Sequence, residues 1–274
     1  MKKSLVSILT IVTVVCIVYG SIVNLKLIKL PSKFFHYNNS SSEITSGEFT
    51  DDFDIKDIKN VNIDCSVADI NIYSGKEFSI DYNCTEGLEP KYTYKNGNIE
   101  ITQNKAAFRK NWGALNNCEI NIAIPQNISI DTLDIASDVG DLEISGLTAN
   151  KMTIDSDTGD CKISNCTIDN LTTKSDVGDI KFEDCQTDIT DVNNNVGNIE
   201  LKDITFNSLN ATSDVGDIDI SSACNIKNYS FDLSSDIGEV EVFSDNHGKK
   251  YKISGDSDKK IIAASNIGDV EVKS

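Results

Sequence analysis

Apolar and polar residues alternate in short runs from about residue 53 onward, and no stretch of useful length keeps a helical period. Period-two alternation is typical of strands that bury one face, so the pattern predicts an all-β fold. Of the three prolines in the chain, none follows Pro125. Because proline has no N–H for a β-ladder, this favours strands that pair on both edges.

A hexapeptide recurs seven times within this pattern, in forms such as SDVGDL, SDTGDC and SNIGDV. Each copy contains one central glycine: Gly140, Gly159, Gly178, Gly197, Gly216, Gly238 and Gly268. The first four spacings are 19 residues, and the last two are 22 and 30. A period near 20 residues indicates a repeat architecture. We therefore expect a parallel β-solenoid, similar to a single-stranded β-helix, with 19-residue coils and glycine at each corner.

Alignment of the copies predicts which columns enter the core. Apolar residues recur seven, five and one positions before the glycine, and two and four positions after it. We expect all of these columns to face inward, including the one directly before the glycine: Val139, Thr158, Val177, Val196, Val215, Ile237 and Ile267. The Ser or Asn three positions before each glycine is expected to bond the turn through its side chain.

An additional coil is predicted upstream, where the segment VNIDCSVADINI fits the same columns with Ala68 in the glycine position. The residues that follow contain an Asn96-Gly97 turn signal, so hairpins are expected to cap or flank the first coils. We assign residues 53–130 to this coil and its cap, and residues 131–274 to the repeats. Asp269–Ser274 is expected to be the final edge strand, protected from pairing by its charges.

The N-terminus carries a different signal. Lys2 and Lys3 precede the uncharged run Leu5–Val23, whose 19 residues are nearly long enough to cross a bilayer as a helix. Residues 1–30 are therefore predicted to be a membrane anchor, which we favour over a signal peptide cleaved near Val18-Tyr19-Gly20. The leading lysines favour a single-pass protein of the cell membrane with its C-terminal domain outside the cytoplasm. The weakly apolar residues 31–52 predict a flexible stalk.

The cysteines fit the core rather than a metal site. Cys166 and Cys185 share an inward column with Leu147, so they are expected to act as small core hydrophobes. As neighbours about 4.8 Å apart they could also form a bridge, and this alternative stays open. The sequence has no C-x-x-C pair and only two histidines, which argues against zinc.

The formal charge of −18 argues against a nucleic-acid partner. Aspartates flank the glycines on both sides, and stacked unit charges 4.8 Å apart repel by about 0.9 kcal/mol in water. Calcium could neutralise them, and the candidate ligands are Asp138, Asp141, Asp157, Asp160, Asp176, Asp179, Asp214 and Asp217. The rows are interrupted by Asn195 and Asn198, and aspartate is common in turns for its own backbone bonds. We therefore favour a structural role and predict no cofactor.

Catalytic motifs are absent from the sequence. There is no G-x-S-x-G, no H-E-x-x-H and no phosphate-binding loop. Acids recur in every copy, so no pair stands out as a general acid and base. These observations predict a protein that is not an enzyme.

The segment INIAIPQNISIDTLDIASDVGDLEI, with the repeated SDVGDI turns behind one anchor, resembles the bacterial putative-adhesin family, whose domain of unknown function is built of β-strand repeats. The resemblance covers about Phe53–Ser274. Members include membrane-anchored accessory proteins of Lia-type envelope-stress systems, and the family has no catalytic residues to carry over. The resemblance implies an adhesin-like or envelope-stress role through contact with an envelope component or a protein. The alternative is a calcium-binding surface module.

Overall fold

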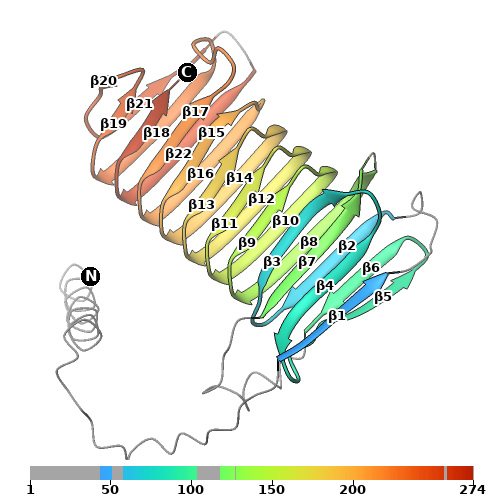
Figure 1. Cartoon of the computed structure of the whole chain (residues 1–274). Helices are drawn as coiled ribbons and strands as arrows, with labels where there is room; N and C mark the ends of the chain where they lie inside the picture. Colours follow the sequence, from blue (N-terminus) through green and yellow to red (C-terminus); the bar gives the residue numbers. More distant parts are fainter. Residues whose placement is uncertain (1–43, 51–57, 104–117, 127, 256–257, 274) are drawn as a thin grey trace, which may run out of the picture. The chain divides into compact units, whose positions relative to one another are not determined.

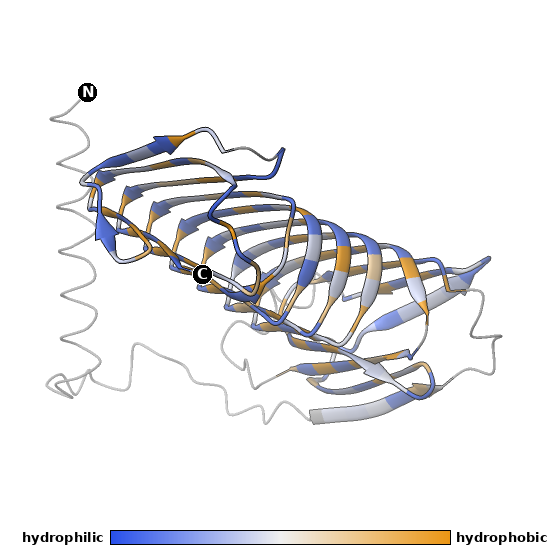
Figure 2. Cartoon of the chain, turned by 90° about the horizontal axis from the view of Figure 1, so that it is seen from above, coloured by the Kyte–Doolittle hydropathy of each residue, from blue (hydrophilic) through white to orange (hydrophobic). Residues whose placement is uncertain are grey.

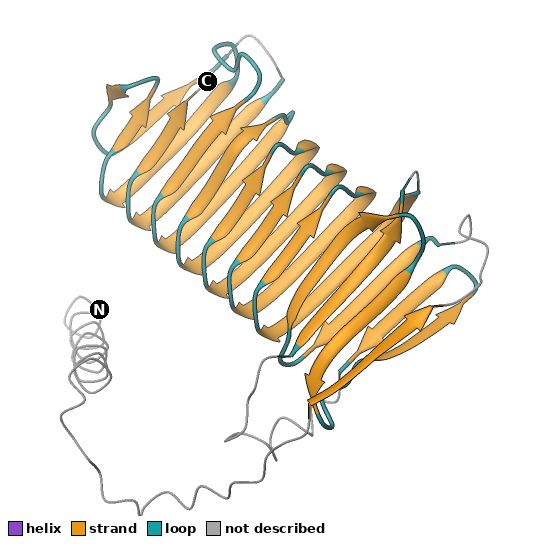
Figure 3. Ribbon diagram, in the orientation of Figure 1, coloured by secondary structure: helices purple, strands orange, loops and turns teal. Residues whose placement is uncertain are grey.

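The computed structural model describes residues 44–50, 58–103, 118–126, 128–255 and 258–273. These residues belong to one compact unit, Ser42–Ser274. Every regular element among them is a β-strand (Figure 3). None of the described residues forms a helix long and apolar enough to cross a membrane, and the predicted anchor lies outside them.

The described strands form two sheets. In spatial order, the first contains β1 (Ile44–Thr50), β4 (Ser79–Thr85), β7 (Glu119–Pro125), β3 (Asp69–Gly75), β9 (Leu142–Ser145), β11 (Cys161–Ser164), β13 (Ile180–Glu183), β15 (Ile199–Ile204), β17 (Ile218–Ser222), β23 (Val270–Lys273), β19 (Val240–Val242) and β20 (Asp245–Asn246). The second contains β21 (Lys250–Ile253), β18 (Ser230–Ile237), β22 (Lys260–Ile267), β16 (Ser208–Val215), β14 (Gln186–Val196), β12 (Thr167–Val177), β10 (Thr148–Thr158), β8 (Ser129–Val139), β2 (Asn60–Cys65), β6 (Asn98–Thr102) and β5 (Lys91–Lys95).

Each repeat contributes a long strand to one sheet and a short strand to the other, joined at the glycine (Figure 1). Strands β8, β10 and β12 pair in parallel and in register, so that Leu133, Met152 and Leu171 stack. These three side chains are fully buried between the sheets. Figure 2 shows the alternation of apolar and polar residues along the strands. The parallel β-solenoid predicted from the 19-residue period is confirmed.

One predicted core column is wrong. The residues directly before the glycines lie outside, and the exposed fraction is 48% for Val177 and 65% for Ile237. The ladder pairs Ser156 with Ser175 and then Thr158 with Val177, leaving out Asp157 between them. The chain turns at this skipped residue, so the alternation that buries the serine no longer buries the side chain after the turn.

The Ser and Asn column bonds some of the corners as predicted, but Ser175 Oγ is buried without a hydrogen-bond partner. Ser235 Oγ donates to the carbonyl oxygen of Gly268 at 2.7 Å, and Ser265 Oγ donates to that of Gly216 at 2.9 Å. Asn194 Nδ2 donates in the same way to the carbonyl oxygen of Gly178 at 2.9 Å. Where they form, these bonds link a corner to the glycine of a neighbouring coil and help to hold the two coils in register.

The upstream coil is present. Strand β2 pairs with β8, which places Val61 beside Leu133 and Ile63 beside Ile135. Its corner differs from the others because the buried Gln103 accepts bonds from the backbone N–H groups of Ser66 and Val67 at 3.0 and 2.7 Å. At the corner of this upstream coil, the Gln103 side-chain amide thus replaces part of the hydrogen bonding of the repeated turn.

The stacking order departs from the sequence order at both ends. Strands β22 and β23 lie between β16/β17 and β18/β19, although they follow both in the sequence. At the other end, β2 and β3 lie between β8/β9 and the later β6/β7. The prediction that Asp269–Ser274 forms the final edge strand is therefore wrong, because β23 pairs with β17 on one side and with β19 on the other.

Antiparallel strands close both ends of the stack. Strand β4 pairs with β7 and carries β1, β5 pairs with β6, and β20 and β21 pair with β19 and β18. The β5–β6 hairpin turns at Asn96 and Gly97, both with positive φ, as the sequence predicts. Phe49 of β1 stacks on Tyr82 and contacts Tyr92, with ring centroids 5.5 and 5.6 Å apart. Residues 44–50 of the predicted stalk are therefore a strand, and the rest of the stalk lies outside the described residues.

The cysteines divide into two classes. Cys84 and Cys118 form a disulfide between β4 and the start of β7, which the sequence did not predict. Cys166 and Cys185 are buried and unbridged, which agrees with their predicted role as core hydrophobes and not with the alternative bridge. Burial, with a smaller contribution from the charge of Asp160, raises the pKa of the Cys161 thiol to about 12. Its thiol thus stays protonated and unreactive at neutral pH.

Candidate contact surface at the glycine corners

The glycine corners present a row of exposed side chains, which we name the corner ridge. In spatial order its members are Val139, Thr158, Val177, Val196, Val215, Ile267 and Ile237. Six are aliphatic, and their exposed fractions run from 37% to 65%. With about 4.8 Å between coils, the ridge is roughly 29 Å long. This feature was hidden in the sequence because the same residues look like one more core column.

A row of acids follows the glycines, and we name it the trailing row. In spatial order it contains Asp69, Asp141, Asp160, Asp179, Asn198, Asp217, Asp269 and Glu239. In each case the Oδ1 of one member accepts a hydrogen bond from the backbone N–H of the next member, with N···Oδ1 distances of 2.7–3.0 Å. An Asp or Asn side chain at this position therefore satisfies a donor that the corner would leave without a partner.

Glu239 marks the end of this ladder. Its N–H donates to Asp269 at 2.8 Å, but among the described strands no further coil lies beyond it to use its own side chain in the same way. The longer carboxylate accepts a bond from Asn246 Nδ2 instead. The single Glu in the trailing row is thus the sequence signal that the Gly238 coil, not the Gly268 coil, is outermost.

A second row of acids precedes the ridge, and we name it the leading row. In spatial order it contains Asp138, Asp157, Asp176, Asn195, Asp214, Asn266 and Asp236. Asn195 Nδ2 donates to Asp176 Oδ1 at 2.7 Å, and Asn266 Nδ2 donates to Asp214 Oδ1 at 2.8 Å. The two asparagines thus separate aspartates that would otherwise be neighbours, which reduces the repulsion along the row.

The calcium candidates lie in these two rows rather than in clusters. Asp141, Asp160, Asp179 and Asp217 belong to the trailing row, and Asp138, Asp157, Asp176 and Asp214 belong to the leading row. Within the described ranges, no group of three or more His, Cys, Asp or Glu side chains has the geometry to hold a metal ion. The trailing row already has a backbone role for one oxygen of each Asp.

Replacing Asp179 by alanine should destabilise the corner, because the N–H of Asn198 loses its acceptor. We expect a loss of about 1–2 kcal/mol in the free energy of unfolding, measured by urea denaturation. Asp179→Asn is the matched control, since Asn198 already fills the same position in the next coil. Equal losses in both variants would contradict the backbone role and leave the charge itself as the stabilising feature.

A hollow of about 340 Å³ borders the corner near its N-terminal end. It is lined by Asp69, Asn71, Asp141, Leu142, Glu143, Asp160 and Lys162. Lys162 Nζ is held by Glu143 at 3.1 Å, so its charge is balanced. The hollow therefore carries a net negative charge from the three trailing-row aspartates.

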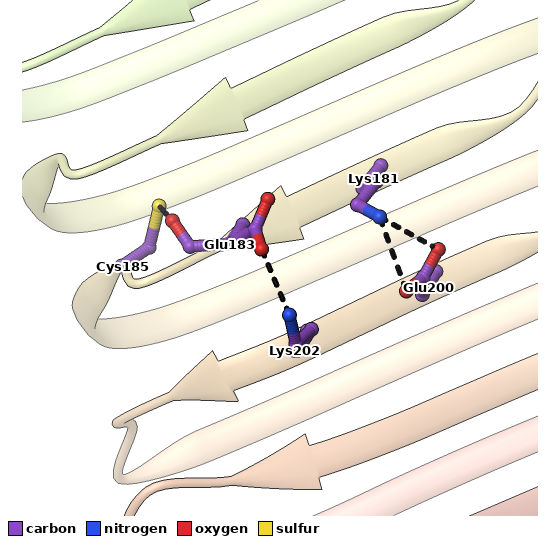
Figure 4. A network of polar contacts seen from close by, with 5 residues as sticks. All are labelled: Lys181, Glu183, Cys185, Glu200 and Lys202. Atoms are coloured by element: carbon purple, nitrogen blue, oxygen red, sulfur yellow. Dashed lines mark hydrogen bonds and ion pairs between the residues drawn. The ribbon is translucent and has the colours of Figure 1, made fainter.

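Several lysines are paired on the outward face of the short strands. Figure 4 shows Lys181 with Glu200 and Lys202 with Glu183, at 3.1 and 2.9 Å. The hydrogen bond and charge of Lys202 hold the pKa of Glu183 below its ordinary value. Both pairs are solvent-exposed and contribute little to stability. Their main effect is to balance charge on this face while the corner rows stay acidic.

Asp219 should make the fold slightly more stable at low pH. Desolvation, followed by the hydrogen bond with Glu271, raises the pKa of the Asp219 carboxyl. Because this pKa is higher in the folded than in the unfolded chain, protonated Asp219 adds to the free energy of unfolding. That stabilisation is present below the unfolded-state pKa and is lost as the pH rises through the folded-state pKa. Asp219→Asn should therefore melt above the wild type at pH 7, by on the order of 1 °C, with no difference near pH 3.5. A lower melting temperature at pH 7 would contradict this.

A profile of the family described as Toastrack DUF4097 matches residues 58–258. The chain belongs to this family. The match runs from the upstream coil through β21 and ends before the coil formed by β22 and β23. It confirms the resemblance to a domain of unknown function built of β-repeats.

Two solved structures that resemble this fold have names related to adhesion. One named as a putative adhesin from Bacteroides fragilis has TM-score 0.51 and 18% identity, and the alignment covers 85% of this chain and 98% of that one. One named as a putative cell adhesion protein from Clostridium sporogenes has TM-score 0.42 and 14% identity, with 84% and 99% covered. The first of these supports the shared fold. No curated protein matches the chain.

Proposed function

We propose that this Toastrack chain is a non-enzymatic, adhesin-like contact protein of the cell envelope, and that the corner ridge is its contact surface. The observation that carries the proposal is the ridge itself, with six aliphatic side chains exposed in one line on a paired scaffold. Contiguous exposed apolar surface on soluble domains commonly marks an interaction site. The name of the Bacteroides fragilis neighbour supports an adhesive role.

An extracytoplasmic location is part of the proposal. The Cys84–Cys118 disulfide supports it, because disulfides form and persist mainly in oxidising compartments. The apolar run Leu5–Val23 supports attachment to the membrane. Protease added to intact cells should degrade the repeats if they lie outside, and protection until lysis would contradict this part.

The contact role can be tested with ridge variants in cells. Threonine is a suitable replacement because Thr158 already occupies the ridge, so Val177→Thr, Val196→Thr and Val215→Thr together should leave the fold intact. We expect this triple variant to reproduce the surface-attachment defect of a strain that lacks the protein. Ile189→Thr, at a similarly exposed site on the outer face of β14, is the matched control.

The same strains separate adhesion from an envelope-stress role. If the protein acts in stress signalling, the deletion and the triple variant should change sensitivity to cell-wall antibiotics and the output of an envelope-stress reporter. If attachment, sensitivity and reporter output all match the wild type in the triple variant, the ridge is not the functional surface and the proposal fails.

A further inference from the structure

We propose that the corner ridge binds a cationic amphipathic segment, one in which Lys or Arg residues flank a line of aliphatic side chains. The inference rests on the proposed contact role and names the chemistry of the partner. The first step is the shape of the surface. The ridge is one side chain wide and continues through seven coils, so it fits an elongated partner rather than a compact ligand.

The second step is charge. The leading row directly precedes the ridge, and the trailing row follows it beyond the glycine, so carboxylates lie on both sides of the aliphatic line. Eleven acids flank the seven ridge positions: Asp138, Asp157, Asp176, Asp214, Asp236, Asp141, Asp160, Asp179, Asp217, Asp269 and Glu239. Lys249, whose Nζ contacts the carbonyl oxygen of Asp236, lies at the C-terminal end of this corner. An acidic partner or an anionic lipid surface would be repelled, whereas cations would be attracted along the whole length.

The third step is the match in dimensions. A ridge of roughly 29 Å corresponds to about nine residues of extended chain at 3.3 Å per residue, or about 19 residues of helix at 1.5 Å. In either form, aliphatic side chains can lie on the valine line while the longer basic side chains reach the carboxylates beside it. The hollow at Asp69, Asp141 and Asp160 offers room for one such basic group.

The probe for this proposal is a fluorescent ten-residue peptide of alternating Leu and Lys. Its anisotropy is measured with the full chain in zwitterionic lipid nanodiscs, and empty nanodiscs give the background. We expect binding at low salt that weakens as salt rises, because the exposed charges are screened within about 8–10 Å. A peptide of alternating Leu and Glu should not bind. No difference between the two peptides would overturn the proposal.

Variants assign the binding to the ridge and its acids. The triple Val177→Thr, Val196→Thr, Val215→Thr variant should bind the Leu–Lys peptide at least tenfold more weakly, while Ile189→Thr binds as the wild type does. Asp176→Asn with Asp214→Asn should weaken binding several-fold and reduce its salt dependence, since an Asn oxygen can still accept the bonds from Asn195 and Asn266. Unchanged binding in both sets would overturn the proposal.

The peptide assay and the cell assay fail separately. If the triple variant abolishes attachment but the Leu–Lys peptide does not bind, the ridge remains a contact surface and the cationic partner is wrong. If the peptide binds through the ridge but attachment, antibiotic sensitivity and reporter output are all normal in the triple variant, the proposed function is wrong while the binding chemistry stands.

Discussion

Replacing Gly178 by alanine is expected to cost more than about 4 kcal/mol, a large part of the stability of a domain. Gly178 has φ +144°, and a Cβ there would lie 2.0 Å from the carbonyl oxygen of Gly159 and 2.6 Å from its carbonyl carbon. Both are backbone atoms of the adjacent coil, so neither can move without separating the coils. The expected result is an unfolded or strongly destabilised protein in circular dichroism and urea denaturation.

Two variants isolate the cause of this loss. Gly248 also has positive φ, at +71°, but a Cβ there meets nothing within 4 Å, so Gly248→Ala should cost only the local strain of about 1–2 kcal/mol. Val177→Thr changes the residue beside Gly178 to one of similar size, so it adds no atom against the adjacent coils. If Gly178→Ala is no worse than Gly248→Ala, close stacking is not the reason for glycine at the corner.

Removing the disulfide should have the second largest effect. The Cys84–Cys118 bridge joins residues 34 positions apart, for which chain entropy gives a stabilisation of about 4 kcal/mol. Cys84→Ala with Cys118→Ala should therefore lower the melting temperature by roughly 10 °C. The bridge ties β4 to the start of β7, so the loss should fall on the N-terminal cap and be visible as faster amide exchange there.

The control for the disulfide is the buried pair of free thiols. Cys166→Ala with Cys185→Ala removes similar side chains from the core without breaking a crosslink. Dithiothreitol should lower the melting temperature of the wild type and leave the Cys84→Ala, Cys118→Ala variant unchanged. A response of that variant to reductant, or equal losses in the two double variants, would contradict a stabilising crosslink.

The repeated coil could be predicted from sequence because each position is sampled several times. Columns such as Leu133, Met152 and Leu171 repeat at a constant spacing, and a parallel in-register stack is the arrangement that buries all of them. The side-chain bonds of the Ser and Asn column could be expected for the same reason, since a small polar residue beside a tight turn usually bonds its backbone.

The outward turn at the corner could not be predicted from alternation alone. In the sequence, a Val before a glycine looks the same whether it faces the core or the solvent. The aspartate that the strand pairing leaves out turns the following side chain outward, and no hydrophobic pattern in the sequence reveals this. The stacking order was equally hidden, because Phe231 and Ile261 are both suited to pair with Leu209 and only spatial competition between coils selects Ile261. Glu239 in the trailing row can be seen in the sequence, but its significance is clear only once the hydrogen bonds between successive members of the row are known.

Interleaved coils and antiparallel strands occupy both ends of the described stack, which restricts where a new repeat can be inserted during evolution. A further 19-residue copy can be accepted only among the coils between Gly140 and Gly216, which stack in sequence order. Each duplication there would raise the height by about 4.8 Å and leave both ends untouched. Relatives with different numbers of repeats would then differ in the length of the stack by whole coils, while the strands at its two ends stay the same.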